Sequence, residues 1–281
     1  MRKIYFLSTI MLIMMAAVWP LNAEAQNDVS VWDGFAESWT QGDGTENNPY
    51  LIENARQLAY IAEMVNAGVT HYDSTYFKLT TDIRIDSSFQ WQPIGSDDSH
   101  SFRGNFDGGC HVITLYLFTN SNYVGLFGHI NGSSICNLNL HGKIKSNNSP
   151  TTAKVGLIGN IDSSSVYNCT NYCNIELNNN HAAQAGGIGG VVSFSTIVNC
   201  ANLGTIMSLP QLSGNTCGGI CGSARHVKIY RNYNVGNISS HYCCGGILVM
   251  FIQAALIVMI LSLFQTATIL VILVPLELIV P

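Results

Sequence analysis

Carboxylates are the first residues in this chain that could do chemistry, because paired Asp or Glu side chains cleave glycosidic bonds and Asp-rich sites bind calcium. The N-terminal candidates are Asp82, Asp86, Asp97, Asp98 and Asp107. Asp107 stands in a Phe-Asp-Gly turn and Asp97-Asp98 in a serine-rich loop, where Asp commonly bonds its own backbone. Between residues 121 and 246 the acids are Asp162 and Glu176, and neither recurs periodically. We therefore predict turn and loop carboxylates and no catalytic residue.

Metal and phosphate sites are the next candidates. Cys169-x-x-x-Cys173 and Cys217-x-x-x-Cys221 could be ligand pairs, but a zinc site needs four ligands at defined spacing, and the eight histidines are scattered. The run Gly186-Gly-Ile-Gly-Gly190 could cradle a phosphate, but no helix is expected after it to supply an N-terminal dipole. The sequence thus predicts no metal, no cofactor and no set of nucleophile, base and orienting residue.

Exposed aromatic side chains are the remaining candidates for function. Trp32, Trp39, Tyr167 and Tyr230 could line a binding face, since aromatic rings give large contact area at small entropy cost. Packing within the core or at its edge is the alternative. The expected partner is an extracellular ligand, either a protein or a glycan.

A repeat running from Val124 to Ile247 must position these side chains. Its frame, Val124-Gly-Leu-Phe-Gly128, returns three times and begins a fourth time at Gly245, where it then fails. A ten-residue block follows each frame, at successive offsets of 31, 31 and 32 residues. The frame glycines are Gly125, Gly128, Gly156, Gly159, Gly187, Gly190, Gly219 and Gly222, and the blocks close on Ile144, Ile175, Ile206 and Ile238. Such a period indicates stacked structural units.

The units are short strands and turns, because apolar runs of Ile, Val and Tyr are cut every few residues by Gly, Asn and Ser. One unit cannot bury its apolar face alone, so the units are expected to stack as an all-β, right-handed parallel β-solenoid. Stacking places Asn171, Asn202 and Asn234 in one column, where their amides can bond along the stack. The recurring glycines suit tight corners with positive φ.

The frame, the asparagine-containing block and their spacing together resemble the GLUG motif of bacterial secreted and surface proteins. The resemblance covers four full copies and the segment upstream of them. It implies a repeat with adhesin-like associations and no assigned chemistry.

The chain begins with a secretory signal over residues 1–25. Arg2 and Lys3 precede an apolar run, and Ala23-Glu-Ala25 supplies the small-residue pattern for cleavage after Ala25. Charged residues make up 10% of the chain and the net charge is −5, which gives no basic surface for nucleic acid. The nine cysteines are an odd number and fall mostly at repeat positions, so we predict buried thiols rather than disulfide bonds.

Residues 26–120 are predicted to be the irregular first coils, continuous in one domain with the repeats over 121–246. A helix is expected after Asn54, which can cap it, with Leu58, Ile61 and Val65 on its apolar stripe and Gly68 ending it. An open solenoid end exposes core and strand edges, so this helix is the candidate N-terminal cap.

The tail over 247–281 is almost entirely apolar, with Glu277 its one charge. Hydropathy predicts a transmembrane helix there. A second hypothesis is a frameshift: joining the third base of each codon to the next two lets Leu263 to Leu273 be translated as a block like Ile197 to Ile206. The nucleotide sequence near codon 248 decides between them.

These observations predict an exported protein, extracellular or at the cell surface, that acts as a non-catalytic adhesion, binding or structural module. One alternative is a carbohydrate-active enzyme, such as a polysaccharide lyase or glycoside hydrolase, on the same scaffold. The other is a membrane protein anchored by the apolar tail, because membrane contact depends on that tail.

Overall fold

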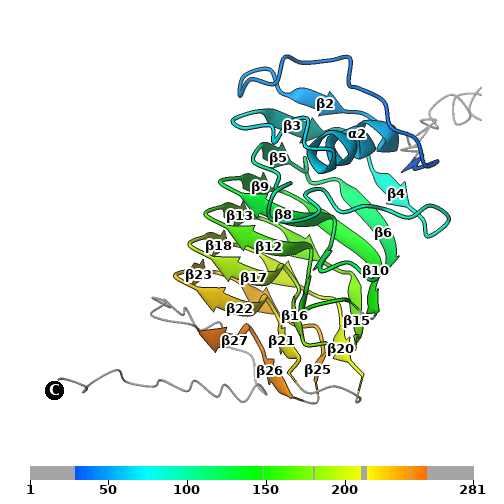
Figure 1. The fold of residues 1–281 in the computed structure, drawn as a ribbon. Coiled ribbons are helices and arrows are strands. Elements are labelled where there is room, and N and C mark those ends of the chain that lie inside the picture. The colour runs from blue at the N-terminus through cyan, green and yellow to red at the C-terminus, as the bar shows by residue number, and fades with distance from the viewer. Residues whose placement is uncertain (1–28, 148, 180, 210–213, 241, 252–281) are drawn as a thin grey trace, which may run out of the picture.

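The computed structural model describes residues 29–147, 149–179, 181–209, 214–240 and 242–251. The predicted signal peptide with Ala25, and residues 252–281 of the apolar tail, lie outside the described residues. Within them the protein is a parallel β-solenoid with one helix, whose coils are stacked along a single axis (Figure 1).

Four parallel sheets form the stack: sheets I and II begin in the N-terminal coils, whereas sheets III and IV begin at the first repeat. Sheet I has ten strands: β1 (Ser30–Val31), β4 (Ile83–Ile85), β6 (Val112–Thr119), β10 (Asn139–Asn147), β14 (Thr170–Asn171), β15 (Asn174–Asn178), β19 (Ala201–Asn202), β20 (Ile206–Ser208), β24 (Tyr233–Asn234) and β25 (Ile238–Ser239). Sheet II has seven strands: β2 (Tyr50–Ile52), β3 (Tyr76–Leu79), β5 (Asn105–Asp107), β9 (Ser134–Cys136), β13 (Ser165–Tyr167), β18 (Thr196–Val198) and β23 (Lys228–Tyr230).

The other two sheets have five strands each. Sheet III consists of β7 (Tyr123–Val124), β11 (Ala153–Val155), β16 (Ala183–Gly186), β21 (Thr216–Gly218) and β26 (Cys243–Gly245). Sheet IV consists of β8 (Phe127–Asn131), β12 (Ile158–Asp162), β17 (Gly189–Ser193), β22 (Cys221–Arg225) and β27 (Leu248–Phe251). Each repeat runs through sheets III, IV, II and I in that order. The stack continues to Phe251, beyond the expected break after Ile247, because β27 pairs with β22 through backbone bonds that tolerate any apolar residue.

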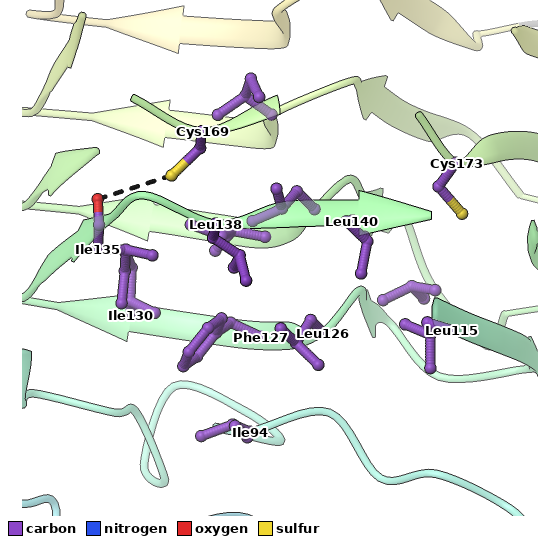
Figure 2. Packing of buried hydrophobic residues seen from close by; sticks show 14 of the residues in the cluster. Ile94, Leu115, Leu126, Phe127, Ile130, Ile135, Leu138, Leu140, Cys169 and Cys173 are labelled. Carbon is purple, nitrogen blue, oxygen red and sulfur yellow. Dashed lines mark hydrogen bonds between the residues drawn. The ribbon is translucent and has the colours of Figure 1, made fainter. Parts of the chain in front are cut away.

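The predicted isoleucine column is confirmed, since Ile144 pairs with Ile175, Ile175 with Ile206, and Ile206 with Ile238. The first three side chains are at most 1% exposed. Each such burial contributes about 1.5 to 3 kcal/mol. Figure 2 shows how inward residues from neighbouring coils, such as Ile94 and Phe127, meet in one core.

The asparagine column also forms as predicted. The amide of Asn171 donates to Asn202 Oδ1, and that of Asn202 donates to Asn234 Oδ1, each over 2.7 Å. Each amide also donates to a backbone carbonyl two residues ahead, so these buried polar groups have partners. The ladder holds the register of one coil on the next.

The frame glycines were predicted to occupy tight corners with positive φ, and this prediction was wrong. None of the eight is among the residues with positive φ. Their backbones instead lie against other backbones: a Cβ at Gly190 would stand 2.4 Å from Val155 N, and one at Gly219 would stand 2.0 Å from Gly246 O. The chain reverses from sheet III to sheet IV so tightly that there is no room for a side chain.

Positive φ falls on two other corners. One corner, between sheets IV and II, is at Gly132, Ser163, Phe194 and His226, and the other, between sheets II and I, is at Asn137, Asn168, Asn199 and Arg231. Asparagine tolerates this backbone region better than most residues. At the second corner Asn168 donates to Asn137 and Asn199 donates to Asn168, over 3.2 and 3.3 Å, forming an outer ladder.

Register in sheet III departs from the alignment of the frames at one step. Val155 pairs with Ala185, whereas the frames align it with Gly186. The connection before β16 is one residue shorter than its predecessor, and the paired glycines Gly186-Gly187 restore the register before sheet IV. Pairing follows the inward apolar residue, because Ala185 is fully buried.

Residues 29–120 form irregular coils of the same stack, as predicted. Strands β3 and β5 extend sheet II. Phe77 pairs with Phe106, and Phe106 pairs with Ile135 of the first repeat. Helix α2 (Ala55–Asn66) begins at Asn54, whose side chain accepts from Gln57 N, and Leu58, Ile61 and Val65 are fully buried.

The helix lies at the N-terminal end of the stack (Figure 1). Its last residue, Asn66, donates to Pro93 O and accepts from Gly95 N, each over 3.0 Å. Ile94, between them, bonds to Leu126 and Gly128 of the first repeat. The order in space is therefore helix, turn 93–95, then sheets III and IV.

Candidate functional site

An aromatic pocket of about 160 Å³ lies on the outer side of sheet I. It is lined by Ser87, Phe89, Gln90, Trp91, Tyr116, Leu117 and Phe118. It forms because β4 pairs with β6 only as far as Leu115, while β6 continues to Thr119. The loop over 87–91 lies in the space that β4 leaves.

The pocket combines exposed rings with a fixed wall. Phe89 and Phe118 are each 45% exposed, whereas Trp91 is 2% exposed and donates its indole N–H to Leu126 O. Trp32 packs edge-on against Phe89 and Trp91, with ring centroids 5.9 and 5.3 Å apart. Trp32, one of the aromatic residues predicted to bind a ligand, therefore packs against two of the rings that line the pocket and is not itself part of its lining.

The other predicted aromatics do not join this pocket. Trp39 contacts Tyr50, Tyr60, Tyr72 and Phe77 in a packed cluster at the N-terminal end. Tyr167 and Tyr230 share a column on the outer side of sheet II, with Val198 between them. Tyr167 is half-buried and Tyr230 is 38% exposed.

Phe89, Tyr116 and Phe118 were not among the binding residues predicted from the sequence. One signal was present, because Tyr116 and Phe118 alternate with the buried Leu115 and Leu117 and so occupy the outer side of a strand. Phe89 gives no comparable signal, since it lies in a loop whose position depends on where β4 ends.

A second group of residues, the polar cluster, lies on the outer side of sheets III and IV and consists of Asp98, Tyr123, His129 and Lys154. Tyr123 donates its hydroxyl to Asp98 Oδ1 over 2.7 Å and accepts from Lys154 Nζ over 2.9 Å. His129 stacks on the Tyr123 ring with centroids 5.7 Å apart. Lys154 Nζ also lies 4.1 Å from the centre of that ring.

Protonation in the polar cluster follows from burial. His129 Nδ1 lies 3.3 Å from Asp98 Oδ1 and from Asp97 O, so it carries the proton, and Nε2 is buried without a hydrogen-bond partner. Burial lowers the pKa of His129, opposed by the Asp98 charge. Burial and the hydrogen bond to Asp98 raise the pKa of Tyr123, and burial lowers that of Lys154.

This arrangement fastens the loop over 96–100 to the stack rather than presenting a reactive group. The Tyr123 hydroxyl stays protonated, and its proton is committed to Asp98. The sequence could not reveal the cluster because Asp98 lies 25 residues from Tyr123, and Tyr123 meets Lys154 only through the sheet III register.

The candidate N-terminal carboxylates bond to residues in their own loops and on the next coil. Asp82 accepts from His111 and Val112 N, and Asp86 pairs with Arg84. Asp97 accepts from Ser99 N and His100, and Asp107 from Gly109 N and Asn137. The turn and loop roles predicted for Asp97 and Asp107 match these contacts.

The cysteines in the described residues are free thiols. Burial raises the pKa of Cys136 and Cys217 to about 11 and that of Cys173 to about 12, which keeps them protonated. Cys217 and Cys244 pair in one column of sheet III. Cys169 bonds weakly to Ile135 O across coils (Figure 2). A thiol held in this form is a small apolar side chain.

Over the described ranges, no group of three or more His, Cys, Asp or Glu side chains could hold a metal ion. The glycine run Gly186–Gly190 spans the end of strand β16 and the start of strand β17, and a strand rather than a helix follows it. In the same ranges, no helix is long and apolar enough to cross a membrane.

The fold thus defines a parallel β-solenoid with an aromatic pocket on one outer side. No protein-family model matches the chain. Over 149 residues, 50% of its length, the chain is 32% identical to a protein of Evansella cellulosilytica named "Putative Gly-rich membrane protein", 16% of which is covered.

A solved structure supports the fold. The chain is similar to the crystal structure of "a putative immunoglobulin A1 protease from Bacteroides ovatus", with a TM-score of 0.61 and 26% identity. The similarity covers 78% of this chain and 66% of that chain. The chain spans less than two thirds of each of these two proteins.

Proposed function

We propose that this protein is an exported, non-catalytic binding module of the GLUG-repeat type, at the cell surface or outside the cell, and that it binds a glycan at the aromatic pocket. The observation that carries the proposal is the exposure of Phe89 and Phe118 beside the polar side chains of Ser87 and Gln90. In this proposal the solenoid is right-handed and helix α2 caps its N-terminal end.

The pocket has the two kinds of contact that a sugar requires. The C–H faces of a sugar ring pack on aromatic rings, and its hydroxyls need hydrogen-bonding partners. Ligand pockets generally have this composition, with apolar walls and a few placed polar groups, at about 300 to 1,000 Å³. The smaller volume here fits one ring or the edge of a longer chain.

A catalytic role has less support. The five candidate carboxylates, those of Asp82, Asp86, Asp97, Asp98 and Asp107, each have a hydrogen-bonding or ion-pair partner. Within the described residues no Ser or Thr hydroxyl is hydrogen-bonded to a histidine. The protease in the name of the Bacteroides ovatus protein is therefore not carried over to this chain. The Evansella name, a membrane protein, agrees with attachment through residues 247–281, which stays a sequence prediction.

The test is a glycan array probed with the exported full-length protein, followed by titration of the best binder. Phe89→Ala and Phe118→Ala should each weaken binding by about tenfold, because each removes a partly exposed ring that lines the pocket. Tyr230→Ala is the matched control, since it removes a 38% exposed ring from sheet II. It should leave both affinity and melting temperature unchanged.

Binding that survives both pocket substitutions, or that is lost with Tyr230→Ala, would contradict the pocket assignment. Release of shorter saccharides from a bound polysaccharide would instead favour the carbohydrate-active enzyme.

A further inference from the structure

Two lysines stand directly beside the exposed rings of the pocket. In the pairing of β6 with β10, Tyr116 lies opposite Lys143 and Phe118 lies opposite Lys145. All four side chains occupy outer positions, since Leu117 and Ile144 between them are buried. A ligand that extends from the pocket across the rings of Tyr116 and Phe118 therefore reaches the ammonium groups of Lys143 and Lys145 on the neighbouring strand.

The same lysines already hold one carboxylate between them. Lys143 Nζ lies 2.8 Å from Glu176 Oε2, and Lys145 Nζ lies 3.0 Å from Glu176 Oε1. The hydrogen bond from Lys143, followed by that from Lys145, lowers the pKa of Glu176. Two ammonium groups are thus spaced to bind the two oxygens of a single carboxylate.

Positive charge remains after this pairing. The two lysine side chains are 43% and 32% exposed, and they share one acidic partner. On the other side of the pocket rings, the Arg84 guanidinium lies 5.5 Å from the centre of Tyr116 and is paired with Asp86. The surface from Arg84 to Lys145 therefore carries one net positive charge in a protein whose total is −5.

We infer that the glycan bound at the aromatic pocket is acidic, and that a uronic-acid carboxylate binds Lys143 and Lys145 while a neighbouring ring packs on Phe118. This inference rests on the proposed function. A carboxylate is favoured over other anions because the lysine pair already accommodates one from Glu176.

The test compares three hexasaccharides on the full-length protein by calorimetry: hyaluronan, its methyl ester, and chondroitin sulfate. Hyaluronan should bind about tenfold more tightly than the uncharged ester, and its affinity should fall as salt rises, because exposed charges are screened. Lys143→Met combined with Lys145→Met should remove that difference and leave the affinity for the ester unchanged. Glu176→Gln should raise the affinity for hyaluronan several-fold by freeing both ammonium groups.

Several results separate this inference from the proposed function. Equal affinity for hyaluronan and its ester, or a lysine double variant that binds both as the native chain does, would overturn the acidic specificity and leave the pocket standing. Tighter binding of chondroitin sulfate that depends on the lysines through its sulfate groups would overturn the assignment to a carboxylate. Loss of binding to all three in Phe118→Ala, with an unchanged melting temperature, would support the pocket itself.

Discussion

The repeated coils and the irregular N-terminal coils share sheets I and II but use their side chains differently. In the repeats, Ile175 meets another isoleucine above and below, and Asn202 meets another asparagine. In residues 29–120 the neighbours differ from coil to coil, and loops 87–91 and 96–100 leave the stack and fold back over it. The aromatic pocket lies where the first of these loops meets β6, and the polar cluster lies where the second meets the first repeats.

This difference has a physical cause. A residue at a repeat position must fit the same kind of residue on both sides, so its type is restricted to those that stack on themselves. A loop at the end of the array has no such constraint. Side chains with a particular chemistry can therefore collect there without weakening the register of the stack.

The largest effect on stability is expected when one member of the buried asparagine ladder is removed. Asn202→Leu deprives Asn234 Oδ1 and Gly204 O of a donor and Asn171 of an acceptor. Each buried group left without a partner costs about 1 to 3 kcal/mol, so the free energy of unfolding should fall by about 3 kcal/mol or more. Urea denaturation followed by circular dichroism measures it.

Asn178→Leu is the control for the ladder, because this asparagine lies on the outer side of β15. Its effect should stay within about 0.5 kcal/mol. Equal losses in the two variants would show that the ladder contributes no more than an outer asparagine.

The frame glycines allow a second, smaller test. In Gly190→Ala the new methyl group would stand 2.4 Å from Val155 N and 2.7 Å from Gln184 O, both backbone atoms. Strain of this kind typically costs about 1 to 3 kcal/mol. Gly246→Ala has nothing within 4 Å of the new carbon and should melt like the native protein. A native melting temperature for Gly190→Ala would disprove the close backbone approach.

The smallest effect on stability is expected in the polar cluster, and it depends on pH. Burial lowers the pKa of His129 below its ordinary value of 6.5, so the folded state favours the neutral ring. Its contribution to stability is complete above that value and declines as the pH falls through 6.5 toward the folded pKa. Asp97, Asp98, Tyr123 and Lys154 face this ring and modulate the shift.

His129→Gln removes the titration. The loss of stability between about pH 7.5 and about pH 5 should therefore be smaller in this variant than in the native protein, while carboxylates with lowered pKa values stay ionised over that range. Thermal melts at both pH values, with His226→Gln at an exposed corner as the control, measure the difference. An unchanged pH dependence in His129→Gln would show that this ring does not titrate on unfolding.

Much of the scaffold could be predicted from the chain alone. The period placed Ile144 on Ile175 and Asn171 on Asn202, and the apolar stripe with Asn54 placed the helix. Local rules determine these features, because identical residues at a fixed spacing have only one way to bury together. The reason for the frame glycines could not be predicted, since the clash at Gly190 is with a strand of the preceding coil.

The stacking unit, its register columns and the alternation of inward and outward side chains along each strand therefore follow from the sequence alone. Only the tertiary structure decided where the surfaces with chemistry lie. The pocket depends on β4 ending at Ile85 while β6 runs on to Thr119, and the polar cluster depends on Tyr123 pairing with Lys154. Both are contacts between segments that carry no common pattern, so they exist only once the coils are stacked.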